Sequence, residues 1–236
     1  MRAESAMTLH RATRDDLAGL PVDVAPRLLG GVLTTTVDGA EVALRLTEVE
    51  AYHGRGTGPV ADPGSHARMG PTARNATMWG EPGHLYVYLS HGIHSCVNVV
   101  CAPEGVAGGI LLRAASVERG TEIARERRQV RRGGRVGAAA CAPTISDRDL
   151  ARGPGRLGQA SGLRHPGDDG LDAVTGLVGT SGASAVLELP DEPAGRVRSG
   201  PRVGVAGHAG TAAFPWRFWL DGEPTVSAFR PGRGAA

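Results

Sequence analysis

Alternation between apolar and polar side chains constrains the fold of this 236-residue chain more than any other feature. Residues 32–37 and 41–50 each have the pattern of a strand, and Asp38-Gly39 between them favours a tight turn. Residues 85–90 alternate in the same way. Because a period of two residues is typical of strands, we expect a chain built around a sheet with hairpins.

The strand at 41–50 is expected to end in two carboxylates. Val42, Leu44 and Leu46 share one face by the two-residue period, and Glu48 and Glu50 continue the same parity. A carboxylate at the end of a core-facing row loses part of its solvent and can act as a general base toward water. We single out Glu50 for this role, and the alternative is a structural glutamate paired with an arginine at a sheet end.

A second hairpin is predicted from residues 85–90 and 95–100. Gly92 marks its turn, which would place Ser90 and His91 at the tip. The hairpin is therefore expected to present polar side chains away from the sheet.

Aromatic residues make up only 4% of the chain, yet all three of its tyrosines, Tyr52, Tyr86 and Tyr88, lie in or beside these strands. His66 lies near the end of a loop rich in glycine and proline, residues 54–70. Tyr52, Tyr88 and His66 could line a slot for a flat ring, since a base taken out of a duplex is held by stacking and by contacts to its edge. Ordinary core packing of the rings is the alternative.

The rest of the chain predicts a single domain. Residues 1–18 have the composition of a polar N-terminal tail, and residues 19–230 form the domain, without internal repeats. Short helices are expected within 20–30, 121–132 and 147–163. Further strands are expected at residues 109–114, 186–189, 202–205 and 216–220.

The composition argues against a membrane-spanning, secreted or metal-binding protein. No apolar run approaches the roughly 20 residues that a membrane span needs, and the first residues lack the apolar core of a secretory signal. The three cysteines show no C-x-x-C pair. The set His91-x-x-His94-x-Cys96 lacks a carboxylate, so a metal site there is the less favoured interpretation. We expect a cytoplasmic protein without a metal or another cofactor.

The charge is nearly balanced, at +2, but all 26 basic residues are arginines. Arginine favours bidentate phosphate contacts, although a biased genome composition accounts equally well for the absence of lysine. Two interpretations of the arginine-rich segment stay open, a solvated helix face and a patch that follows phosphates. The segment contains Arg119, Arg125, Arg127, Arg128, Arg131, Arg132 and Arg135.

Several motifs in order along the chain resemble the alkyladenine (3-methyladenine, or methylpurine) DNA glycosylase family. No single motif is specific, but the ordered set with its spacing is, and the likeness extends from about Leu20 to Ser227. The motifs are Glu48-Val49-Glu50-Ala51-Tyr52, His66, Arg74-Asn75, Pro82-Gly83-His84-Leu85-Tyr86-Val87-Tyr88, Gly92, Cys96, Asn98, Leu111-Leu112-Arg113-Ala114, Asp147-Arg148-Asp149-Leu150, Gly153-Pro154-Gly155-Arg156-Leu157 and the stretch from Arg202 to Gly210.

The resemblance implies roles for the matching residues. Glu50 would activate water, and Arg113 would help to hold that water and the carboxylate. Tyr52, His66 and Tyr88 would form the stacking slot for the damaged base.

Three further positions receive roles from the same resemblance. Asn98 would screen out purines that carry an exocyclic amino group at the minor-groove edge, and Leu111 would help to close the pocket. The residue that fills the gap left by the extruded nucleotide is usually a tyrosine in the family. His91 occupies that position here, and it is smaller and can carry a charge.

The implied fold is a single mixed α+β domain on a curved, mostly antiparallel sheet, open-barrel-like, with peripheral helices and a protruding hairpin. The implied activity is that of a monofunctional DNA glycosylase, which hydrolyses the N-glycosidic bond of alkylated or deaminated purines in double-stranded DNA at the start of base excision repair. We expect a bacterial-type monomer that associates with the nucleoid when it acts. A nucleic-acid-binding module without catalysis and a carbohydrate hydrolase are the alternatives.

Overall fold

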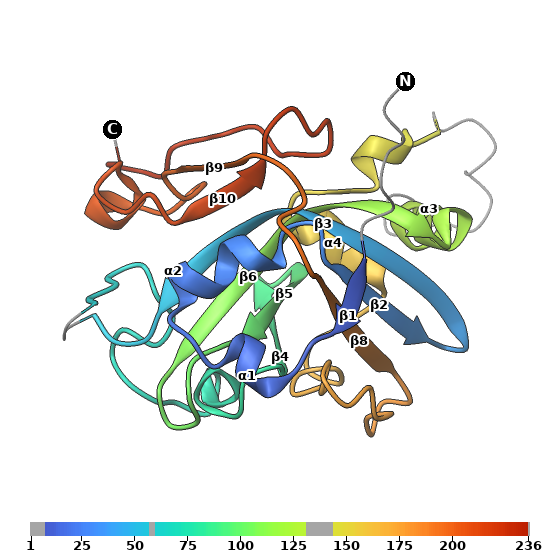
Figure 1. The fold of residues 1–236 in the computed structure, drawn as a ribbon, viewed down its shortest axis with the longest axis horizontal. Coiled ribbons are helices and arrows are strands. Elements are labelled where there is room, and N and C mark those ends of the chain that lie inside the picture. The colour runs from blue at the N-terminus through green and yellow to red at the C-terminus, as the bar shows by residue number, and fades with distance from the viewer. Residues whose placement is uncertain (1–7, 57–59, 131–143, 236) are drawn as a thin grey trace.

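A computed structural model of the chain describes residues 8–56, 60–130 and 144–235. Ten strands form one sheet that is not closed into a barrel, and short helices surround it (Figure 1). This arrangement confirms the predicted mixed α+β fold with a mostly antiparallel sheet.

The strands are β1 (Leu9–Arg11), β2 (Val32–Val37), β3 (Ala40–His53), β4 (Leu85–Ser90), β5 (His94–Val100), β6 (Gly108–Arg119), β7 (Ala151–Arg152), β8 (Ser184–Pro190), β9 (Val197–Gly200) and β10 (Arg217–Leu220). The α-helices are α1 (Arg14–Leu17), α2 (Pro21–Val24), α3 (Thr121–Val130) and α4 (Pro154–Ser161). The 3-10 helices are η1 (Ala25–Leu28), η2 (Ala76–Trp79), η4 (Asp147–Asp149) and η5 (Gly207–Gly210).

Strand β3 is the centre of the sheet, whose main order is β1-β8-β2-β3-β6-β5-β4. On one side β3 pairs with β6 along almost its whole length. On its other side β2 pairs with residues 40–45, and β10 pairs with residues 48–50. The C-terminal part of the chain therefore joins the sheet beside Glu48 and Glu50, above β3 in the view of Figure 1.

Two bulges switch the face to which the side chains of β3 and β6 point. Leu46 pairs with Ala115 and Glu48 with Ala114, so Thr47 has no partner on β6. Each extra residue shifts the alternation by one position. The apolar row of β3 therefore continues at Val49, which is fully buried in the main core, and not at position 48.

This switch corrects our prediction that Glu48 and Glu50 continue the core-facing row. Both carboxylates belong to the opposite face of the sheet, because Val49 and Ala51 take the core positions. They are fully buried nevertheless, since the C-terminal part of the chain covers them. Arg113, the unpaired residue of the matching bulge on β6, faces them.

The main core lies on one face of the sheet. Its strand residues follow the alternation, for example Leu85 and Val87 on β4 and Val97 and Val99 on β5. Helices α1, α2, α3 and α4 contribute side chains to the same cluster. The alternate residues of β4 and β5 are left for the opposite face, where a smaller cluster includes Tyr86 with Tyr88 packed against it.

Helix α4 lies unusually close to β5. A Cβ on Gly158 would come within 1.9 Å of the carbonyl oxygen of Ser95, so only glycine permits this approach. Pro154 at the first position of the helix has no N–H to satisfy and suits the start of a helix. The close packing brings Pro154 to the rim of the cavity described below.

Three sequence predictions differ from the structure. Residues 9–17, expected within the polar tail, form β1 and α1, and Leu17 is fully buried. Residues 202–205 form a turn and not a strand, whereas Val197–Gly200 is a strand that the alternation did not reveal. These segments are short, so tertiary pairing and not periodicity decides their conformation.

The described part of the arginine-rich segment is neither a fully solvated helix face nor a patch of arginines that all face solvent. Arg127 donates to four backbone carbonyls, including that of Val37, and Arg128 is buried and donates to that of Leu150. Arg125 pairs with Asp147. These side chains of α3 fasten neighbouring loops, and residues 131–143 of the segment lie outside the described residues.

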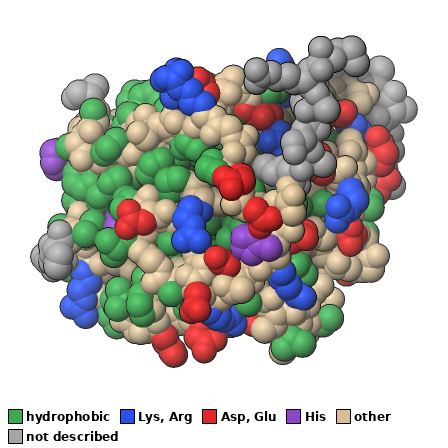
Figure 2. All heavy atoms as spheres, viewed as in Figure 1, with side chains coloured by type: hydrophobic (Ala, Val, Ile, Leu, Met, Phe, Trp, Pro, Cys, Tyr) green, Lys and Arg blue, Asp and Glu red, His purple; other side chains and the backbone are tan. Residues whose placement is uncertain are grey.

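Figure 2 shows one face of the molecule, on which acidic and basic side chains are interspersed around hydrophobic ones. Among the described residues, this view therefore offers no broad surface of a single charge. No described helix is both long and apolar enough to cross a bilayer.

Candidate active site

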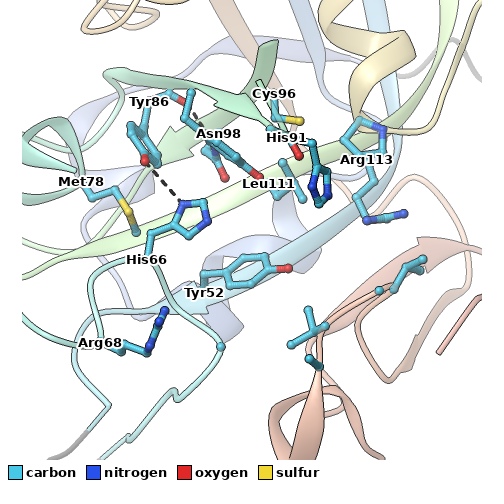
Figure 3. A pocket seen from close by; sticks show the side chains of 18 of the residues that line it. Tyr52, His66, Arg68, Met78, Tyr86, His91, Cys96, Asn98, Leu111 and Arg113 are labelled. Atoms are coloured by element: carbon cyan, nitrogen blue, oxygen red, sulfur yellow. Dashed lines mark hydrogen bonds between the residues drawn. The ribbon is translucent and has the colours of Figure 1, made fainter. Parts of the chain in front are cut away.

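A cavity of about 560 Å³ opens on the face of the sheet opposite to the main core. Side chains from β3, β4, β5, β6 and the loop before η2 converge on it (Figure 3). The sequence-predicted residues that line it are Tyr52, His66, Tyr88, His91, Asn98, Leu111 and Arg113.

Glu50 is the one predicted residue that does not line the cavity, because its side chain is fully buried behind the wall. Its Oε1 accepts a hydrogen bond from the backbone N–H of Val203 at 2.6 Å. Its Oε2 accepts one from the Tyr52 hydroxyl at 2.9 Å and one from Arg113 Nη1 at 3.3 Å. All three partners line the cavity, so a single layer of residues separates the carboxylate from the cavity.

Arg113 bridges two buried carboxylates. Its Nε donates to Glu48 at 3.0 Å, while its Nη1 reaches Glu50. Burial alone would lower the pKa of this guanidinium, but the two glutamates raise the pKa above its ordinary value. The arginine therefore stays charged and supplies a fixed positive group beside Glu50.

The hydrogen bonds of Glu48 fit a structural role, in which the carboxylate holds neighbouring segments together. Arg217 donates to its Oε1 at 2.7 Å, and Ser227 donates from its hydroxyl and its backbone N–H at 2.9 and 2.8 Å. Together with Arg113 these groups saturate the carboxylate. Both glutamates accept from Arg113, but Glu50 also contacts Tyr52 and Val203, so it has three lining residues as partners and Glu48 has one.

Aromatic rings form one part of the cavity wall. Tyr86 and Tyr88 stack with their centroids 5.4 Å apart, and His66 meets Tyr88 edge-on at 4.6 Å. The Tyr86 hydroxyl and His66 Nδ1 lie 3.4 Å apart, as the dashed line in Figure 3 marks. The structure thus brings His66 and Tyr88 together as predicted and adds Tyr86, while Tyr52 lines the same cavity from β3.

Burial keeps these rings uncharged near neutral pH. It lowers the pKa of His66, and the nearby Arg74 and Arg68 lower it further. Burial also raises the pKa of Tyr86 to about 12, and it raises the pKa values of Tyr52 and Tyr88 as well. The wall therefore presents neutral, electron-rich rings, which suit a flat and electron-poor ligand.

Asn98 and Leu111 face each other across β5 and β6, where they pair in register. Asn98 is held by a hydrogen bond from its Nδ2 to the carbonyl oxygen of Tyr86 at 3.0 Å. Within the described residues no donor reaches its side-chain oxygen, which is able to accept a hydrogen bond from a ligand. Leu111 supplies apolar surface beside it.

His91 lies at the tip of the β4–β5 hairpin, as predicted. It is exposed and adopts a positive φ of 49°, and Gly92 follows with a φ of 68°. A hydrogen bond from the N–H of Ile93 to the carbonyl of Ser90 closes the turn. The turn thus holds an exposed imidazole at the mouth of the cavity, in a backbone conformation that non-glycine residues seldom adopt.

Two parts of the site were missed by the sequence reasoning. Residues 203–206 line the cavity from a turn, and the N–H of Val203 binds Glu50. Behind them Arg202 and Asp62 form a fully buried bidentate ion pair with both distances at 2.8 Å. The pair spans 140 positions of the chain, and no local pattern marks such a contact.

The described residues contain no group of three or more histidine, cysteine or acidic side chains placed to hold an ion. Cys96 and Cys101 are buried free thiols, and Cys141 lies outside the described residues. Cys96 lines the cavity beside Tyr88, and burial raises the pKa of its thiol.

Comparison with known proteins agrees with this geometry. The model of the methylpurine-DNA glycosylase family matches residues 15–224. A protein of Leifsonia xyli named "Putative 3-methyladenine DNA glycosylase" is 47% identical over 96% of each chain. Proteins with the same name are 44% identical in Streptomyces avermitilis, over 92% of this chain and 91% of the relative, and 43% identical in Mycobacterium tuberculosis, over 94% and 98%. The chain therefore belongs to the methylpurine-DNA glycosylase family.

Proposed function

We propose that this DNA N-glycosylase takes alkylated or deaminated purines of the 3-methyladenine type out of duplex DNA and hydrolyses their glycosidic bond with a water activated by Glu50. The observation that carries the proposal is the position of Glu50. It is a buried carboxylate held by Tyr52, Arg113 and Val203, all of which line a cavity with an aromatic wall.

For a cationic, alkylated purine the chemistry needs only a base and a water. The water oxygen bonds to the sugar C1′ while the bond from C1′ to the purine nitrogen breaks. The proton of the water goes to Glu50, and the bonding electrons leave with the purine. An alkylated purine is already electron-poor, so it needs little acid assistance as a leaving group. Arg113 places a fixed positive charge beside Glu50 and donates a hydrogen bond to its Oε2.

The aromatic rings would hold the extruded base. Tyr52 on β3 and the His66–Tyr88 pair are neutral, and a cationic lesion is attracted to electron-rich ring faces. Unstacking a base costs a few kcal/mol and is easiest for a weakened pair, so selection for damage begins before the chemical step. Asn98 would then test the edge of the base by leaving no room for an exocyclic amino group.

His91 would fill the gap that the extruded nucleotide leaves. Its exposed position on a tight hairpin beside the cavity suits a wedge that enters the minor groove. An imidazole is smaller than the tyrosine usual in the family, so it would fill the gap less completely.

A second cavity, of about 400 Å³, supports contact with the DNA backbone next to the site. Arg128, Arg152 and Arg156 line it together with the start of α4, and Pro154 borders both cavities. Arginines and a helix N-terminus both favour phosphate. We expect Arg156→Ala to weaken binding to damaged and undamaged duplexes alike and to reduce the salt dependence of binding, because a phosphate contact carries no sequence information.

The direct test is release of free base by the purified chain. Duplexes with a methylated purine, with hypoxanthine or without damage are incubated with excess enzyme, and free bases are separated from DNA. The proposal expects release from a damaged duplex and none from the undamaged control. Tight binding to damaged DNA without release would favour a binding module instead.

A further inference from the structure

We infer that the buried Arg202–Asp62 ion pair is a positioning device that holds three separate parts of the active site in register. The inference rests on the proposed function, because it assigns the pair to the hydrolysis carried out at Glu50. Neither side chain lines the cavity, and both are fully buried. The pair therefore acts only through its neighbours.

The first neighbour is Tyr52. The Arg202 guanidinium lies over the Tyr52 ring at 4.4 Å from its centroid, within the distance of a cation–π contact. Arg202 also donates to the carbonyl of Ala51, the preceding residue on β3, at 3.1 Å. Because Tyr52 lines the cavity and Arg202 does not, the arginine supports the ring from outside the cavity.

The second neighbour is the loop that carries His66. Asp62 accepts hydrogen bonds from the N–H of His53 at 3.0 Å and from that of Gly64 at 2.9 Å. The carboxylate thus ties the end of β3 to the loop, while both of its oxygens bind Arg202. Pro63 and Gly64 are themselves part of the cavity wall.

The third neighbour is the donor that binds Glu50. Val203 follows Arg202 directly, and its N–H lies 2.6 Å from Glu50 Oε1. Arg202 also donates to the carbonyl of Ala209 at 3.1 Å, which fixes the other end of the turn that lines the cavity. Anchoring Arg202 therefore fixes the position of this N–H.

One ion pair thus links the ring at Tyr52, the loop before His66 and the hydrogen bond to Glu50. Displacing reacting groups by about 1 Å can cost about 100-fold in rate. We therefore expect its loss to slow base release in molecules that remain folded.

The test compares two aspartates that each hold an arginine through both oxygens. Asp62→Asn weakens the pair at the site, and Asp172→Asn weakens the pair with Arg14, whose distances are 2.9 and 2.7 Å and which lies outside both cavities described. Base release is measured in single turnover with saturating enzyme, at a temperature well below the Tm of each variant. While folded enzyme stays in excess over DNA, the rate constant reports on folded molecules, and thermal unfolding measures separately how many are folded.

The expected result is a rate constant about 10- to 100-fold lower for Asp62→Asn, unchanged affinity for undamaged duplex, and a wild-type rate constant for Asp172→Asn. A wild-type rate constant in Asp62→Asn would overturn the inference, and so would equal slowing of both variants. An inactive wild-type protein would instead count against the proposed function.

A second variant, Gly64→Ala, tests the role of the ion pair if Asp62→Asn does not fold. Gly64→Ala keeps both charged residues, but its Cβ would lie 2.7 Å from Arg202 Nη2, so the guanidinium must move. The inference expects this variant to lower the rate constant at least several-fold, and Asp172→Asn remains the control. A wild-type rate constant in a folded Gly64→Ala protein would overturn it.

Discussion

Replacing Glu50 by glutamine is the perturbation whose effect the structure defines best. The carboxylate accepts hydrogen bonds on both oxygens, from Val203 on one side and from Tyr52 and Arg113 on the other. An amide has only one oxygen, and its NH₂ group must face a donor wherever it is placed. Facing Val203 is the less unfavourable choice, because the other orientation would bring the NH₂ group against a buried arginine.

The cost of this choice can be estimated. One buried N–H loses its acceptor, which destabilises a protein by about 1–3 kcal/mol. For a domain of this size the loss corresponds to a decrease of about 2–12 °C in Tm. Loss of the base slows the chemical step by about 10²- to 10⁴-fold. The lining residues that would contact the base are unchanged, so affinity for a damaged duplex should stay close to that of the wild type.

The assay combines three measurements on Glu50→Gln and the wild type: thermal unfolding, binding to a damaged duplex, and single-turnover base release at 25 °C. A wild-type rate constant would refute the role of Glu50 as the base. An unchanged Tm would refute the hydrogen-bond reasoning, and a large loss of binding would show that Glu50 helps to hold the base itself.

Three further predictions concern the hairpin, the pocket edge and pH. His91→Ala should weaken capture of the extruded base more than it slows chemistry, because an emptied wedge lets the nucleotide return to the stack; unchanged fluorescence of a base analogue on binding would contradict this. Asn98→Ala removes the side-chain hydrogen bond to the carbonyl of Tyr86 and should lower the free energy of unfolding by about 0.5–1.5 kcal/mol while it relaxes discrimination against guanine, as competition between damaged and undamaged duplexes would reveal. Burial lowers the pKa of His66 below 6.5, so the stability linked to this residue is complete above pH 6.5 and is lost as the pH falls from 6.5 through the lower pKa of the folded state. The unfolding free energy should therefore fall less steeply on acidification in His66→Gln than in the wild type. The two slopes should differ by less than about 1.4 kcal/mol per pH unit, and equal slopes would contradict the prediction.

The sequence predicted the hairpins well because turn chemistry and alternation agree there. Asp38-Gly39 lies between β2 and β3, and the tyrosines of β4 fall on the face opposite to the core as their parity requires. Apolar residues at every second position leave few other ways to bury a strand.

The direction of the two glutamates could not be predicted from parity. The bulges at Thr47 and Arg113 insert one residue each, and neither position carries a glycine or proline that would mark it. The sequence reasoning therefore assigned the wrong face to both glutamates, and the role of Glu50 as the base stays a prediction.

Most candidate site residues were predicted because they lie in short ordered motifs on β3 to β6. The parts that were missed come from the C-terminal segment, where Val203 and Arg202 approach residues about 150 positions away. Contacts of this range depend on how the chain returns to the sheet at β10, and local periodicity carries no information about that path.

Hydrolysis by an activated water is the central claim, and trapping with borohydride tests it most directly. A glycosylase that attacks with an amine forms an imine with the sugar, and borohydride converts it into a permanent protein–DNA adduct. This chain has no lysine, and its α-amino group at Met1 lies outside the described residues. Turnover of a damaged duplex in borohydride should yield free base, no adduct, and a full-length strand that breaks only in alkali. An adduct that maps to Met1 would contradict the water mechanism and reduce Glu50 to a supporting role.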